Sequence, residues 1–192
     1  MSSNFKVHFA TLARLASPLM VGLALNTGIA SAAEEVSDSA WRQFDIDGKT
    51  MSVRPDSNAD GTRSYEVLAE DNGLVMSRLL VNRNGVLSNA WKTDLDGDGS
   101  PEVVVAISQL NGTNEGAVDI HEWDGYKFDS VQAPRKIAAE KNVYDGHDQF
   151  EFAAGKLRRA FPRFTQAGEN RVPTGETASY QFDMQSGQWI AP

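Results

Sequence analysis

Residues 94–107 read Asp94-Leu95-Asp96-Gly97-Asp98-Gly99-Ser100-Pro101-Glu102-Val103-Val104-Val105-Ala106-Ile107. The second part of this stretch, residues 103–107, is a short apolar run rich in β-branched side chains, which is typical of a buried β-strand. The first part, residues 94–102, combines acidic residues with glycines, and these residue types favour turns. The stretch therefore predicts a tight acidic loop that leads directly into a core strand.

The acidic residues of this loop have the spacing of a calcium site. Ca²⁺ binds about six to eight oxygen atoms, and a short loop can bring alternate residues to one point. Gly97 and Gly99 supply the backbone freedom for such a loop. An EF-hand is excluded, because its twelfth position is a bidentate Glu and the twelfth residue here is Val105. The remaining prediction is a calcium loop that enters a strand, with these ligands: Asp94, Asp96, Asp98, the carbonyl of Ser100, and Glu102.

The same residues have a second interpretation that needs no ion. Asp and Gly are common in turns, because an Asp side chain accepts hydrogen bonds from nearby backbone N–H groups. The acidic loop, residues 94–102, could be such a turn. The sequence leaves both interpretations open.

The rest of the chain indicates an all-β protein. Short strand-like segments are separated by Asp-Gly and Asn-Gly turns, and this spacing favours an antiparallel β-sandwich or flattened barrel of meander strands. The Asp-Gly-Asp-Gly motif occurs once, which argues against a propeller of similar blades. One short helix is expected over residues 135–142. The expected strands are 44–47, 50–54, 63–70, 74–82, 86–93, 102–110, 117–123, 126–132, 148–153, 156–163, 176–184 and 188–191.

Residues 1–32 have the pattern of an export signal. Lys6 and Arg14 precede an uncharged apolar stretch, and Ala30-Ser31-Ala32 forms a small-x-small cleavage pattern. No second long apolar stretch follows, so we expect no membrane contact after signal removal. The chain has no cysteine, which suits a bacterial periplasmic protein without disulfides. We expect a single all-β domain over residues 33–192, and the sequence does not indicate its oligomeric state.

The charge balance excludes one class of partner. The predicted signal holds two of the 18 basic residues and none of the 26 acidic ones, so the remainder has a formal charge of −10. Nucleic acid is therefore not an expected partner, whereas basic proteins and cations are favoured by electrostatic steering.

Candidates for catalysis are scarce. Outside the predicted signal the chain has two histidines, His121 and His147, and it has no nucleophile elbow or phosphate loop. His121 alternates with Val118 and Ile120 and is expected to face outward from a strand. His147 is expected in a turn, bonded to a backbone carbonyl or to Asp148. We therefore predict a protein that is not an enzyme.

A basic segment, residues 156–164, interrupts the acidic chain with Lys156-Leu157-Arg158-Arg159-Ala160-Phe161-Pro162-Arg163-Phe164. We expect Leu157 and Phe161 on one side of a strand and the arginines, Arg158 and Arg159, on the other. Either the segment pairs with acidic neighbours, or it forms a partner-contact face, since Arg and aromatic residues are common anchors in interfaces.

Three segments together resemble the periplasmic inhibitors of invertebrate-type lysozyme. They are the acidic loop, Gly146-His147-Asp148-Gln149-Phe150, and Gly155-Lys156-Leu157-Arg158-Arg159-Ala160-Phe161-Pro162. The resemblance is strongest over residues 88–185. It implies an exported, all-β, single-domain protein, which agrees with the reading of the residues above.

The resemblance also implies a mechanism. Family members insert an exposed loop, which carries a Ser and a Tyr in an SGxY-like segment, into the active-site cleft of a lysozyme. Here that loop falls on residues 111–116, Asn111-Gly112-Thr113-Asn114-Glu115-Gly116, where Glu115 stands at the position of the Tyr and no Ser is present. We therefore predict a lysozyme inhibitor with this contact loop. The alternative prediction is a calcium-stabilised periplasmic binding module without lysozyme inhibition.

Overall fold

The computed structural model describes residues 42–57, 63–131, 134 and 142–192. The chain divides into two units, Met1–Glu34 and Glu35–Pro192, and everything below concerns the second. The predicted signal over residues 1–32 lies outside the described residues. So does the expected helix over residues 135–142, apart from Asn142, which lies in a turn.

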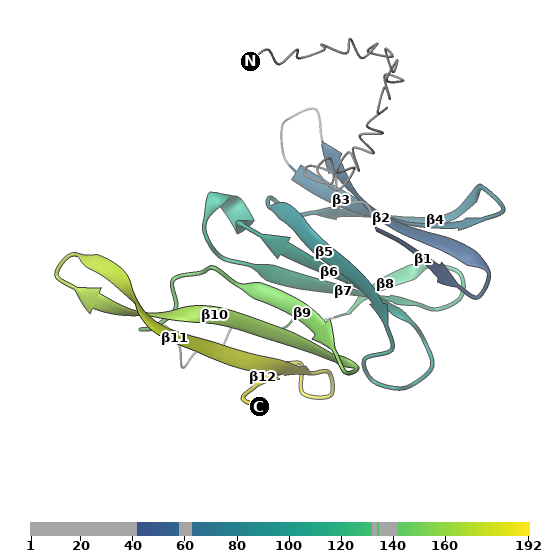
Figure 1. The fold of residues 1–192 in the computed structure, drawn as a ribbon. Helices are drawn as coiled ribbons and strands as arrows, with labels where there is room; N and C mark the ends of the chain where they lie inside the picture. The colour runs from purple at the N-terminus through teal and green to yellow at the C-terminus, as the bar shows by residue number, and fades with distance from the viewer. Residues whose placement is uncertain (1–41, 58–62, 132–133, 135–141) are drawn as a thin grey trace, which may run out of the picture. The chain divides into compact units, whose positions relative to one another are not determined.

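The described residues form three antiparallel sheets of four strands each (Figure 1). Each sheet is a meander in which consecutive strands are neighbours. The first sheet contains β1 (Arg42–Ile46), β2 (Lys49–Ser57), β3 (Arg63–Asp71) and β4 (Leu74–Asn82). The second contains β5 (Val86–Thr93), β6 (Glu102–Ser108), β7 (Ala117–Trp123) and β8 (Phe128–Val131). The third contains β9 (Gln149–Ala153), β10 (Lys156–Ala167), β11 (Asn170–Asp183) and β12 (Gln188–Ile190).

This architecture confirms the all-β prediction and the sandwich alternative within it. Within the described ranges no sheet closes on itself, and helix is limited to one short 3-10 turn, η2 (Leu110–Gly112). No helix in this part of the chain is long and apolar enough to cross a membrane. The main departure from the expected strands is the β10–β11 hairpin. Its pairing continues to Ala167 and Asn170, beyond the expected strand end at residue 163.

The second sheet lies between the other two (Figure 1). On β6, Val103, Val105 and Ile107 pack against the first sheet, with β1 beside β5 and β4 beside β8. The alternate residues Val104 and Ala106 pack against Leu157, Phe182 and Trp189 of the third sheet. Because successive side chains of a strand point to opposite faces, a strand buried on both faces needs a continuous apolar run. Residues 103–107 supply that run.

Candidate functional site

The acidic loop connects β5 to β6 and is folded by its own carboxylates. Asp94 accepts hydrogen bonds from the N–H groups of Gly97, at 2.8 Å, and of Gly99, at 3.2 Å. Both glycines have positive φ, a conformation that few other residues adopt without strain. Asp96 accepts from the N–H of Asp98 at 3.2 Å. The bonds that the turn interpretation requires are therefore present.

Glu102, the first residue of β6, does not fit a simple turn. Its side chain is fully buried, on the face of β6 that also carries Val104. One oxygen, Oε2, accepts a hydrogen bond from the N–H of Leu95 at 2.8 Å. The other, Oε1, is buried without a hydrogen-bond partner. Burial, opposed by the Leu95 bond and assisted by the nearby Asp96 and Asp94, raises the pKa of Glu102 to about 7.

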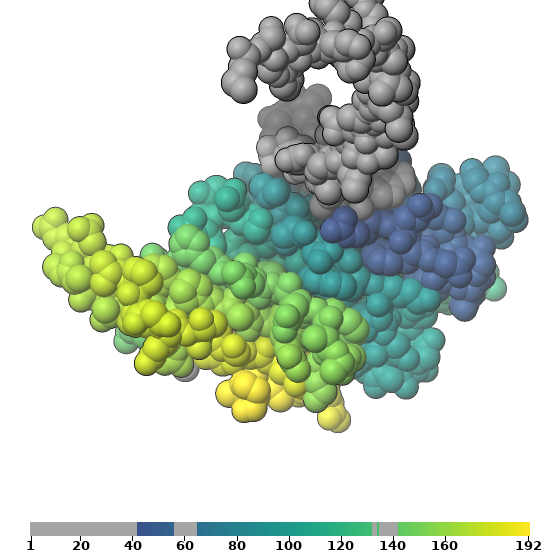
Figure 2. Space-filling model, viewed as in Figure 1, coloured from purple at the N-terminus to yellow at the C-terminus, as the bar shows by residue number. Residues whose placement is uncertain are grey.

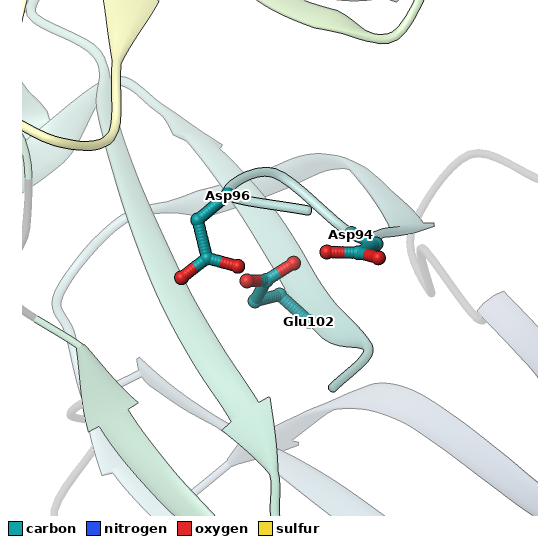
Figure 3. A group of neighbouring side chains, drawn as sticks. All are labelled: Asp94, Asp96 and Glu102. Carbon is teal, nitrogen blue, oxygen red and sulfur yellow. The ribbon is translucent and has the colours of Figure 1, made fainter. Parts of the chain in front are cut away.

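Three carboxylates meet at this point. Asp94, Asp96 and Glu102 each offer one oxygen, and the three atoms lie within 4.8 Å of one another. Figure 3 shows the Glu102 carboxylate between those of Asp94 and Asp96. Asp98, which the spacing also predicted as a ligand, lies outside this group, and its Oδ1 accepts from the N–H of Ser100 at 2.7 Å. The structure thus gathers part of the predicted ligand set.

The contact loop, residues 111–116, follows the other end of β6. Its residues 111–114 are exposed, and Figure 2 shows the segment after β6 at the surface. The loop is closed by bonds from the N–H of Leu110 to the carbonyl of Glu115, at 2.8 Å, and from the N–H of Asn111 to the carbonyl of Asn84, at 2.6 Å. Thr113 adds a bond from its Oγ1 to the carbonyl of Leu110 and accepts one from the N–H of Glu115. The loop is therefore exposed but internally bonded.

An irregular segment that is distant in the chain, residues 144–148, supports the base of the contact loop. The N–H of His147 donates to the carbonyl of Asn114 at 2.6 Å, and the N–H of Gly116 donates to Asp148 Oδ2 at 2.7 Å. A Cβ at Gly116 would lie 2.8 Å from the Cβ of Asp148, and one at Gly146 would lie 2.4 Å from the Asn114 carbonyl oxygen. The two segments approach so closely that only glycine fits at these positions.

The Asp148 side chain joins segment 144–148 to the basic segment, residues 156–164. Its carboxylate is fully buried and accepts from Arg159 Nε at 2.7 Å and from the Tyr144 hydroxyl. The Arg159 guanidinium also lies over the rings of Tyr144 and Phe161. Burial and the bond to Asp148 raise the pKa of Tyr144, which keeps its hydroxyl a proton donor. Two of the three segments that carry the family resemblance, residues 146–150 and 155–162, thus meet beneath the contact loop, whereas the acidic loop lies at the other end of β6.

The expectation that both arginines share one face of β10 is wrong. Arg159 is buried on the same side as Leu157 and Phe161, because side chains along a strand alternate and these residues are two apart. Arg158 is exposed on the opposite side, 3.5 Å from Glu151. Of the two, only Arg158 lies on the surface.

The expectation that His121 faces outward is also wrong. The His121 side chain is buried between the first two sheets and shares a hydrogen bond with the Tyr65 hydroxyl at 2.7 Å. The same hydroxyl donates to Asp119, which also pairs with Arg83. Burial lowers the pKa of His121 to about 4, so the imidazole is neutral at physiological pH. The sequence pattern of β7 does not reveal the burial of His121, because both faces of the second sheet are covered.

His147 was expected in a turn, but it lies in an irregular segment, residues 144–148, and has positive φ. Its exposed ring stacks on Phe164 at a centroid distance of 5.8 Å. Its backbone, and not its imidazole, supports the contact loop. Sequence reasoning missed the roles of Tyr144 and of Arg83, since no local pattern marks a partner that is distant in the chain. Comparison of the chain with protein-family models, with curated proteins and with solved structures finds no match.

Proposed function

We propose that this protein is a periplasmic, non-enzymatic lysozyme inhibitor that inserts the contact loop, residues 111–116, into the active-site cleft of a lysozyme. The single observation that carries this proposal is the combination of exposure and internal bonding in that loop. A loop that is already ordered loses little conformational entropy when it binds, and this favours affinity. The resemblance to inhibitors of invertebrate-type lysozyme selects the partner.

The anchoring of the loop supports this role. Residues at its end are fixed to the buried pair of Asp148 and Arg159 and to the backbone of His147. The exposed tip is thereby supported by a part of the core that does not need to rearrange on binding. Rigid support of an exposed loop is a general property of binding sites on stable scaffolds.

The chemistry of the exposed tip fits a cleft lined by carboxylates. Asn111 and Asn114 carry amide donors, whereas the Thr113 hydroxyl donates to the carbonyl of Leu110 within the loop. The active sites of glycoside hydrolases contain paired carboxylic acids, which accept hydrogen bonds from such groups. Gly112 and Glu115 complete the proposed contact set, and Arg158 offers a second, exposed contact. Arg159 serves in this proposal as a support for the loop, because it is buried.

A second candidate function is a calcium-stabilised periplasmic binding module that does not inhibit lysozyme. The observation that favours it is the contact loop itself, which lacks the Ser and Tyr of the inhibitors that the chain resembles. Both functions require the same fold. Only the first requires that a lysozyme be inhibited.

A cell-wall lysis assay separates these candidates. We expect the purified protein without its first 32 residues to slow invertebrate-type lysozyme, with animal C-type and G-type lysozymes measured in parallel. An absence of inhibition at micromolar excess over all of these enzymes would contradict the inhibitor proposal and favour the second candidate.

Variants of the loop test the mechanism. The double substitution Asn114→Ala with Glu115→Ala is expected to raise the inhibition constant by about 30-fold or more, the usual cost of losing central contacts. The matched control is Glu169→Ala with Asn170→Ala, which alters an exposed acid and amide at the tip of the β10–β11 hairpin. Equal inhibition by the two double variants would show that the contact loop is not the inhibitory element.

A further inference from the structure

The buried carboxylates among the described residues differ in their partners. Three of them are paired with arginine: Glu66 with Arg54 and Arg78, Asp119 with Arg83, and Asp148 with Arg159. Glu102 is buried as completely as these, but no Lys or Arg of the described residues is ion-paired with it. A buried carboxylate without a cation is costly, because it loses its hydration without compensation. Glu102 therefore lacks a positive partner that the fold supplies elsewhere.

The Glu102 carboxylate, which carries the unpartnered Oε1, lies between two further carboxylates. Asp94 and Asp96 flank it, with ligand oxygens of the three residues within 4.8 Å of one another (Figure 3). An ion with oxygen ligands at about 2.4 Å can join oxygens up to about 4.8 Å apart. The three carboxylates are therefore close enough to share one calcium ion. Without a cation, these negative charges would repel one another.

The donor set identifies the class of cation. All three ligands are carboxylates, with no imidazole or thiolate in the group, and such oxygen sites select hard ions. Mg²⁺ demands near-ideal octahedral geometry at a shorter distance, whereas Ca²⁺ accepts irregular arrangements completed by water. We propose that Asp94, Asp96 and Glu102 bind one Ca²⁺ ion, with Asp98 outside its ligand set. The ion joins the acidic loop to the first residue of β6 and does not depend on the proposed inhibition of lysozyme.

The first test measures calcium binding directly. Equilibrium dialysis of the purified protein against Ca²⁺ is expected to give one bound ion per chain, with weaker binding of Mg²⁺. Calcium at about 100 times the dissociation constant is expected to raise the melting temperature by about 5–10 °C relative to chelator. A melting curve that is the same in calcium and in chelator, with no ion bound in dialysis, would overturn the proposal and leave a turn only.

Three substitutions of similar size test the ligand set. Asp96→Asn and Glu102→Gln are each expected to weaken calcium binding by about 30-fold or more, since each removes a charged ligand. The control, Asp98→Asn, removes the same charge from the same loop and is expected to weaken binding by only about threefold, through the solvent-screened field. Cooperative melting in chelator, at a temperature no lower than that of the wild type, shows that the variants fold. Equal losses in Asp96→Asn and Asp98→Asn would contradict the three-carboxylate site.

Discussion

Two loops flank the same buried strand, β6, and each lies beside a buried carboxylate. The two carboxylates differ in their hydrogen-bond and charge partners. The contact loop after β6 rests on Asp148, which has three donors, including the guanidinium of Arg159. The acidic loop before β6 rests on Glu102, which has one donor, the N–H of Leu95, and one oxygen without a hydrogen-bond partner. The first carboxylate is satisfied by the protein, and the second is not.

This difference separates a structural support from a proposed ligand site. Charge pairing and hydrogen bonds fix Asp148, so its loop is held in one conformation. Glu102 is surrounded by Asp94 and Asp96 instead of by basic residues. In this protein the buried acid that is paired with an arginine supports a loop, and the buried acid that lies among other acids is the centre of the proposed calcium site.

The largest expected effect concerns Asp148, the carboxylate that is paired with Arg159. Arg159→Met is expected to lower the free energy of unfolding by about 3–5 kcal/mol, because Asp148 would remain buried without a cation. The matched control is Arg158→Met, the exposed neighbour on the other face of β10, with an expected loss below about 1 kcal/mol. Urea unfolding curves measure both. Similar losses in the two variants would remove the distinction between a buried pair and a surface pair.

An intermediate effect is expected at His121, a buried base beside the paired carboxylate Asp119. The pKa of His121 is lowered to about 4 in the folded state from about 6.5 in the unfolded chain. Below pH 6.5 the unfolded state therefore binds more protons, and stability falls as the pH drops toward 4, by about 3 kcal/mol in total. Urea unfolding at several pH values measures this slope.

The control for His121 is the other described histidine. His121→Gln is expected to remove that part of the pH dependence, whereas His147→Gln, at an exposed position, is expected to retain it. The carboxylates contribute their own acid sensitivity to all three proteins. If the stability of His121→Gln depended on pH as steeply as that of the wild type, another group would be responsible for this pH dependence.

The smallest expected effect is a change in the free energy of unfolding, and its sign depends on calcium. In chelator at pH 8, Glu102→Gln is expected to raise the free energy of unfolding by about 1–2 kcal/mol, because it removes a buried charge whose pKa is raised to about 7. In saturating calcium the wild type is expected to be the more stable protein. Thermal and urea unfolding in both buffers measure this reversal in the order of stability. If Glu102→Gln were less stable than the wild type in both buffers, the prediction would be contradicted.

Much of the fold was predictable from local patterns. The Asp-Gly and Asn-Gly turns marked the ends of most strands, and the apolar run of residues 103–107 marked β6. Alternation failed where burial on both faces removed its signal, as at His121 on β7. It was also misapplied to Arg158 and Arg159, since adjacent residues of a strand point to opposite faces.

The candidate sites were predictable only in part. The acidic loop and its possible ligands followed from residue types at fixed spacing within one short segment. Which of those carboxylates converge depended on the burial of Glu102 beneath the loop, which excluded Asp98 from the group. The support of the contact loop by Asp148 joins residues that are 32 positions apart, and no local pattern reports such a contact.

Local sequence is enough to account for the strands, the turns and the acidic composition of the loop before β6, because backbone preferences and side-chain alternation act over a few residues. The tertiary structure alone decided the partners of the buried charges. The pairing of β9 with β10 brings Arg159 to Asp148, and the folding of the acidic loop over β6 leaves Glu102 facing Asp94 and Asp96. Burial removes water from these groups, so only the packed fold determines which charges are paired within the protein and which are left without a basic partner.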